Sequence, residues 1–305
     1  MAVLEIVASA LRMSVPILLA ALGAVYSERG GIVNIGLEGM MIMGAFWGAT
    51  GAYFHGPVAG VVWAVAAAVA FALLHALATV TFRVDQIVSG VALNLLAYGV
   101  ARFSSITIFK MATTTPHVPK FTPFDIPLLD RVPALHPLVT GLSPLLVLPF
   151  ALVPLSAWVL NRTVFGLRLR ACGENPLAAD TLGVNVFAMR YAGVILSGVL
   201  AGLAGAYLAM EHVGMYVEGM TQGRGFIALA AMIFGNWNPA GALIAALLFG
   251  LAEAVSFRAV EAGSAVPYQF IKMIPYVLTI AVLSGVVRRA TPPAADGLPY
   301  DREER

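Results

Sequence analysis

The sequence predicts an all-α integral membrane protein with about nine transmembrane segments. Of its 305 residues, 60% are hydrophobic and only 11% are charged, whereas a soluble domain carries about 25% charged residues. The apolar residues gather into runs that approach the roughly 20 residues a helix needs to cross a bilayer. Two of these runs are interrupted by polar, glycine-rich stretches at corresponding places in the two halves of the chain. That pattern is typical of a transporter built from inverted repeats.

Nine apolar segments set the expected number of spans. They lie at residues 4–26, 32–54, 57–82, 86–109, 141–161, 188–212, 225–236, 239–257 and 268–287. The seventh is too short to cross as a straight helix of about 20 residues, so we expect a half-helix or a helix that begins in irregular chain. Glu5 and Arg12 interrupt the first apolar run, which does not resemble a cleaved signal sequence. We therefore expect the first span to be retained.

The distribution of Lys and Arg predicts the orientation, because cytoplasmic loops carry an excess of these residues. If the loop 170–190 is cytoplasmic, ten basic residues lie on that side and four on the other. The ten are Arg29, Arg83, Arg162, Arg168, Arg170, Arg190, Arg288, Arg289, Arg302 and Arg305, and the four are Lys110, Lys120, Arg131 and Arg258. The N-terminus is then outside and the C-terminus inside. Residues 1–290 form the transmembrane domain, and 291–305 are expected to be a flexible, solvated cytoplasmic tail.

The same topology gives two repeat halves of opposite direction, at about 4–109 and 188–287, with a loop at 162–187 between them. The first half is interrupted by "SERGGIVNIGLEG" at residues 27–39, and the second by "YVEGMTQGRGF" at residues 216–226. Irregular backbone at membrane depth is tolerated only where it is buried in protein or lines a water-filled cavity. The two breaks are therefore expected to lie on a solute pathway.

Five polar residues are the candidates for lining that pathway. Asn34 and Glu38 are four residues apart, so a short helix would place them on one face. Thr221 and Gln222 stand among the glycines of the second break, and Asn94 lies within the fourth apolar segment. The alternative is that each break only forms a tight turn, and that Asn94 makes a structural hydrogen bond between helices.

The sequence predicts a transport subunit rather than an enzyme. A phosphate-binding loop would read G-x-x-x-x-G-K-[ST], but no glycine–lysine pair occurs in the chain. No nucleophile elbow, no metal-ligand spacing and no basic run suited to nucleic acid is present. Transport must be driven either by a separate ATPase or by an ion gradient. In the second case Glu253, a carboxylate within an apolar segment, is the candidate ion ligand.

The segment "ENPLAADTLGVNV" in the loop 162–187 predicts a short amphipathic helix. Asn175 can begin it, Pro176 occupies the favoured first position, and Gly183 can end it. Leu177 and Leu182 would offer apolar contact to a partner protein. The alternative is an interfacial linker helix without a partner.

Three stretches carry a resemblance to a known family: "ERGGIVNIGLEGMMIMGAFWGA", "RACGENPLAADTLGVNV" and "GRGFIALAAMIFGNWNPAGALIAALLFG". They resemble permease subunits of bacterial ABC importers, in the group of ribose, branched-chain amino acid and nucleoside permeases, and most closely the nucleoside permeases. The similarity runs from about residue 10 to 288. It implies a type II ABC importer-like permease fold that moves a nucleoside by alternating access. A simple sugar is the second possibility for the solute, and a branched-chain amino acid the third.

The resemblance also implies the partners. They are a second permease subunit, identical or different, cytoplasmic ABC ATPase subunits that bind ATP and Mg, and an extracytoplasmic substrate-binding protein; this chain itself would bind no cofactor. The complex would reside in the bacterial cytoplasmic membrane. The helix that docks on the ATPase would include Glu174, Asn175, Ala178, Ala179, Asp180 and Gly183.

Overall fold

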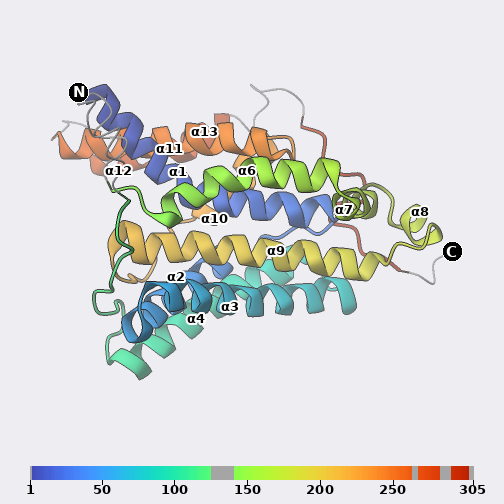
Figure 1. Cartoon of the computed structure of the whole chain (residues 1–305), viewed down its shortest axis with the longest axis horizontal. Helices are drawn as coiled ribbons and strands as arrows, with labels where there is room; N and C mark the ends of the chain where they lie inside the picture. Colours follow the sequence, from blue (N-terminus) through green and yellow to red (C-terminus); the bar gives the residue numbers. More distant parts are fainter. Residues whose placement is uncertain (1, 125–140, 263–266, 282–289, 302–305) are drawn as a thin grey trace.

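The computed structural model describes residues 2–124, 141–262, 267–281 and 290–301. Within these ranges the chain is an all-helical bundle, and its only extended pairing is two isolated β-bridges. The long helices lie side by side, and the beginning of α1 (Ala2–Arg29) and the short helix α8 (Pro176–Thr181) lie at opposite ends of the bundle (Figure 1).

The other helices follow in chain order. They are α2 (Leu37–His55), α3 (Pro57–Ala76) with its π-helical continuation η1 (Leu77–Thr81), α4 (Gln86–Phe109), α6 (Pro144–Arg162), α7 (Val164–Glu174), α9 (Val186–Ala206) with its π-helical continuation η2 (Tyr207–Val213), α10 (Arg224–Phe234), α11 (Pro239–Glu261), α12 (Tyr268–Lys272) and α13 (Ile274–Ala281). Several begin at a polar side chain that accepts a hydrogen bond from a free backbone N–H of the first turn. These caps are Asp85, Ser143, Thr163, Asn175, Asn185 and Asn238.

Six helices in the described ranges are long and apolar enough to cross a membrane. They are Leu4–Arg29, Pro57–Thr81, Gln86–Phe109, Pro144–Arg162, Val186–Val213 and Pro239–Glu261. The number is smaller than the nine predicted segments, because α2, α10 and the last predicted segment are not among the six. α2 begins only at Leu37, and 15 of its 19 residues are buried within the protein. α10 has 11 residues, and the last predicted segment continues beyond the described residues.

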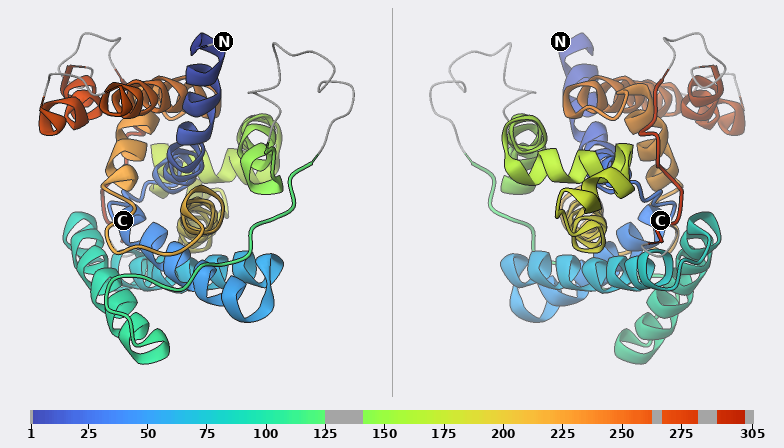
Figure 2. Two further views of the ribbon diagram at one scale, coloured as in Figure 1. Left: turned by 90° about the vertical axis from the view of Figure 1, so that its left-hand side faces the viewer. Right: turned by 90° about the vertical axis from the view of Figure 1, so that its right-hand side faces the viewer.

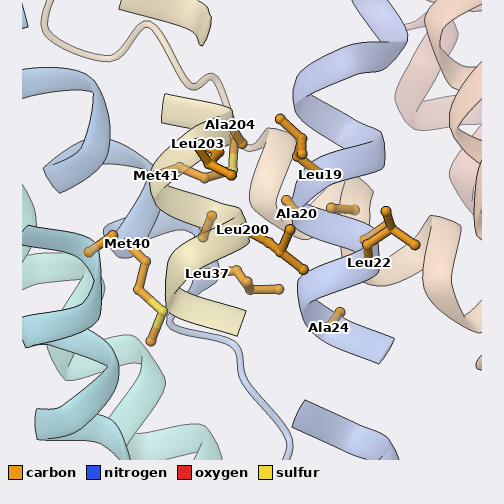
Figure 3. Packing of buried hydrophobic residues seen from close by; sticks show 14 of the residues in the cluster. Leu19, Ala20, Leu22, Ala24, Leu37, Met40, Met41, Leu200, Leu203 and Ala204 are labelled. Atoms are coloured by element: carbon orange, nitrogen blue, oxygen red, sulfur yellow. The ribbon is translucent and has the colours of Figure 1, made fainter. Parts of the chain in front are cut away.

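The central helices pack in matching pairs. α1 packs along α11, α9 packs along α3, and α1 and α9 also contact each other, so that α9 lies between α1 and α3 when the bundle is viewed along its length (Figure 2). Gly44 and Gly202 allow close approach of α2 and α9, since a Cβ at Gly44 would lie 2.6 Å from the Gly202 carbonyl oxygen. Figure 3 shows the resulting core, in which Leu37, Met40 and Met41 of α2 pack with side chains of α1 and α9.

The C-terminal segment differs from the flexible tail that its composition predicts. Residues 290–301 lie against the end of the bundle where α8 is found, and Ala295 and Tyr300 are buried. Tyr300 packs with Cys172, Ala179 and Val186. The segment is rich in proline and alanine, and Tyr300 and Leu298 are its only large apolar side chains, so its composition gave too little apolar surface to predict docking. Residues 302–305 lie outside the described residues.

Candidate functional site

The two predicted breaks meet at Glu38. Its Oε1 accepts hydrogen bonds from the Thr221 hydroxyl at 2.6 Å and from the Gly223 backbone N–H at 2.9 Å. Its Oε2 accepts a third from the Gly225 N–H at 2.8 Å. The side chain is only 2% exposed. One carboxyl group therefore joins the first half of the chain to the second.

The side-chain carboxylate of Glu38, a residue of α2, lies at the N-terminus of α10. The backbone N–H groups at that end have no partner within their own helix. A carboxylate is favoured at that position, because the helix dipole is positive there. Two glycines allow this close approach. Gly223 adopts the left-handed conformation with φ 76°, and a Cβ at Gly225 would lie 2.6 Å from the Glu38 backbone nitrogen. We call this arrangement the Glu38 junction.

The junction lies one length of α10 away from the end of α1. The far end of α10 leads to Trp237, whose Nε1 donates to Glu28 Oε2 at 2.6 Å and whose carbonyl accepts from Arg29 Nε at 2.9 Å. The end of α10 is thus level with the end of α1. Because α10 has 11 residues and rises 1.5 Å per residue, its N-terminus lies about 16 Å from that end, measured along the helix.

Asn94 and Asn34 hold the beginning of α2. Asn94 Oδ1 accepts from the Gly39 N–H at 2.7 Å, and its Nδ2 donates to the Ile35 carbonyl at 3.1 Å. These bonds give Asn94 a structural role between helices. Asn34 is buried, and its Nδ2 donates to Ser197 Oγ at 2.9 Å. Within the described residues its Oδ1 has no hydrogen-bond partner, which leaves one acceptor available at the junction.

A cavity of about 680 Å³ lies between the two halves, in the part of the bundle that contains the beginning of α1. Residues of α1, η2, α10, α11 and α13 line it, and its size is within the usual range for small-molecule sites. The polar lining includes Arg12, Glu211, His212, Gln222, Arg224 and Glu253. Of the five predicted pathway residues only Gln222 lines this cavity. Asn34, Glu38, Asn94 and Thr221 are buried in the packing beside it.

Arg224 and Glu253 form an ion pair in the cavity wall. Arg224 Nη2 lies 3.2 Å from Glu253 Oε2, and the two side chains are 12% and 15% exposed. Arg224 was not one of the five predicted residues, although a cation between two glycines of the second break, Gly223 and Gly225, was a recognisable signal. Glu253 is neutralised by its partner, which weakens the alternative that it binds a coupling cation.

The helix predicted in the loop is present as α8. Asn175 Oδ1 accepts from the Ala178 N–H at 3.0 Å, Pro176 follows, and Gly183 ends the turn with φ 80°. Leu177 and Leu182 are 45% and 85% exposed. α8 therefore presents apolar side chains outward.

The predicted ATPase-contact residues do not share one face. Glu174, Asn175, Ala178 and Gly183 are exposed, and Asp180 is half-buried. Ala179, in contrast, is 2% exposed. Its methyl group packs inward against Tyr300 and Cys172 because a six-residue helix needs an apolar anchor to stay in place. Ala179 is thus available to hold α8 rather than to contact a partner.

Broken helices that meet beside a polar cavity, in a bundle of helices long and apolar enough to cross a membrane, define a transport permease. The family model described as "Branched-chain amino acid transport system / permease component" matches residues 6–283. The chain belongs to this family of ABC transporter permeases and is a multi-pass membrane protein.

Three relatives show how close the similarity is. The guanosine ABC transporter permease protein NupQ of Bacillus subtilis (strain 168) is 42% identical, over 98% of this chain and 97% of its own length. The nucleoside ABC transporter permease protein NupC of Lactococcus lactis subsp. cremoris is 42% identical over 97% and 96%. The putative glucose ABC transporter permease protein TsgC13 of Haloferax volcanii is 36% identical over 94% of each chain. No solved structure matches the chain.

Proposed function

We propose that this chain is the permease subunit of an ATP-driven nucleoside importer and that it works by alternating access. Two relatives of nearly full length are a guanosine and a nucleoside permease, and they support the solute class. The observation that carries the mechanism is the Glu38 junction, where one buried carboxylate fastens the broken helices of the two halves together. A relative movement of the halves would open the pathway at that point.

The packing supports an inverted repeat within the fold. If α1 corresponds to α9 and α3 to α11, then the pair α1–α11 is the counterpart of the pair α9–α3, and both pairs pack extensively. The helices α2 and α10 each follow a break, and α2 packs on α9 and α3 as α10 packs on α1 and α11. With these two and the segment that ends beyond α13, the predicted count of about nine membrane segments is retained in this proposal.

The proposed partners follow from the family. An ABC permease works with ATPase subunits that bind ATP and Mg and with an external binding protein, and a second permease chain would complete the pathway. We place α8 on the cytoplasmic side of the bacterial inner membrane, together with the C-terminus, and the N-terminus outside. The cavity then faces the side from which solute arrives.

We propose that the cavity receives the solute, and that the Arg224–Glu253 pair shapes its wall. Replacing Glu253 by Gln leaves the Arg224 charge without its partner, which costs binding energy in a site of low exposure. We expect the KM for nucleoside uptake to rise about tenfold. Uptake kinetics of the reconstituted complex would measure this. Glu261→Gln, at the exposed end of the same helix, is the matched control and should leave the KM unchanged. An unchanged KM in Glu253→Gln would show that the solute does not pass through this cavity.

The solute class can be tested by competition. Vesicles containing the complete importer should take up labelled guanosine, and unlabelled adenosine or uridine should reduce that uptake. Glucose or ribose in the same excess should not. Competition by the sugar and not by the nucleosides would favour the simple-sugar alternative, to which the putative glucose permease points.

A further inference from the structure

Residues 290–301 form a segment that the proposed mechanism does not use, and we call it the C-terminal strap. We infer that the strap is a coupling element, which positions α8 against the cytoplasmic ends of the two halves so that movement of α8 reaches the pathway. This inference rests on the proposed function.

One side of the strap holds α8 and the end of α7. The Ala295 N–H donates to the Gly173 carbonyl at 2.8 Å, and the Ala294 N–H donates to Glu174 Oε2 at 3.3 Å. The Tyr300 ring packs with Ala179, the one buried residue of α8. α8 has only six residues and otherwise packs against α7 and α9, so the strap adds a third contact that holds it in position.

The other side of the strap contacts both halves of the bundle. The Thr291 N–H donates to Asn236 Oδ1 at 2.9 Å, in the turn between α10 and α11. Asp301 accepts hydrogen bonds from both terminal nitrogens of Arg83, just before α4. The strap therefore spans from the second repeat half to the first, across the end of the bundle that carries α8.

A buried cation marks the centre of these contacts. Arg190 at the beginning of α9 is 1% exposed, and its Nη1 donates to the Leu298 carbonyl at 3.0 Å. Its guanidinium also lies over the Tyr300 ring, 5.9 Å from the centroid. In the described part of the chain its Nε and Nη2 have no hydrogen-bond partner. Asp296 of the strap places an opposite charge near this guanidinium, so the buried Arg190 depends on the docked strap for its compensation.

Asp296 is a second ionisable side chain, after Arg190, that is buried where the strap docks. Burial raises the pKa of its carboxyl to about 6, although the nearby charge of Arg190 opposes this shift, so ionisation of the carboxyl costs more in the docked strap than in water. The remaining contacts must offset this cost. The docked state is thus a balance of opposing terms, which a movement of α8 could shift.

The test compares variants within the strap, using the full importer with its ATPase and binding protein in vesicles. Tyr300→Ala removes the ring that covers Ala179. We expect the amount of nucleoside taken up per ATP hydrolysed to fall about tenfold, while basal ATP hydrolysis persists. Leu298→Ala is the matched control: its side chain is 55% exposed and its backbone contact to Arg190 remains, so coupling should stay at the wild-type level. A merely structural strap would lower uptake and hydrolysis together and leave their ratio unchanged.

A charge reversal provides a second test if the importer with Tyr300→Ala does not assemble. Asp301→Arg should lower the ratio of uptake to hydrolysis, and the additional change Arg83→Asp should restore it. If the ratio in Tyr300→Ala or in Asp301→Arg equals that of the wild type, the strap is not a coupling element. A wild-type importer that takes up no nucleoside would instead contradict the proposed function.

Discussion

Replacing Glu38 by Gln is expected to reduce nucleoside uptake more than any other single conservative change in this chain. The amide replaces one of the two carboxylate oxygens by an NH2 group, which then faces either Thr221 and Gly223 or Gly225, while the remaining oxygen still accepts from the other side. A buried donor that faces another donor costs about 1–3 kcal/mol, and α10 loses the negative charge at its N-terminus. We expect uptake to fall at least about tenfold, which corresponds to 1.4 kcal/mol. Uptake would be normalised to the amount of assembled complex.

Two substitutions at Thr221 provide the controls for this result. Thr221→Ser retains the hydroxyl that donates to Glu38 and should transport at nearly the wild-type rate. Thr221→Val removes that donor and leaves the two backbone donors, so its effect should lie between those of Ser and Glu38→Gln. Wild-type uptake in Glu38→Gln would show that the two breaks form turns without a role in transport.

The second large effect is expected at α8. Leu177 and Leu182 are its exposed apolar side chains, and exposed apolar groups are the ones that a partner surface can bury. Replacing both by Asp should prevent docking of the ATPase and lower uptake about a hundredfold, without disturbing the buried core. Replacing both by Met keeps their apolar character and should have little effect. Normal uptake in the Asp variant would place the contact with the ATPase elsewhere on the chain.

The ends of most membrane helices could be predicted from the sequence. The segments predicted at 57–82 and 86–109 correspond to Pro57–Thr81 and Gln86–Phe109. The boundaries were visible because Gly56, Pro57 and the cap Asp85 fix the backbone at these points. α8 was predictable for the same reason, since Asn175, Pro176 and Gly183 are local signals.

Contacts between distant parts of the chain could not be predicted. Glu38 and Thr221 are 183 positions apart, and a single sequence contains no signal that links them. Local chemistry also left two readings of Asn94 open until its bonds to Gly39 and Ile35 were known. The inward direction of Ala179 and the docking of Tyr300 depend on each other, so neither could be recognised alone.

If this chain receives its driving force from a partner through α8, solute uptake must depend on ATP on that side of the membrane. Uptake measured with ATP on one side only is therefore the direct test. Vesicles would contain the complete importer in one orientation, with the binding protein on the side of the cavity. We expect nucleoside to accumulate only when ATP is present on the side of α8, and we expect the variant with Asp at positions 177 and 182 to accumulate none. Accumulation by this chain alone, without ATP and driven by an ion gradient, would contradict the account.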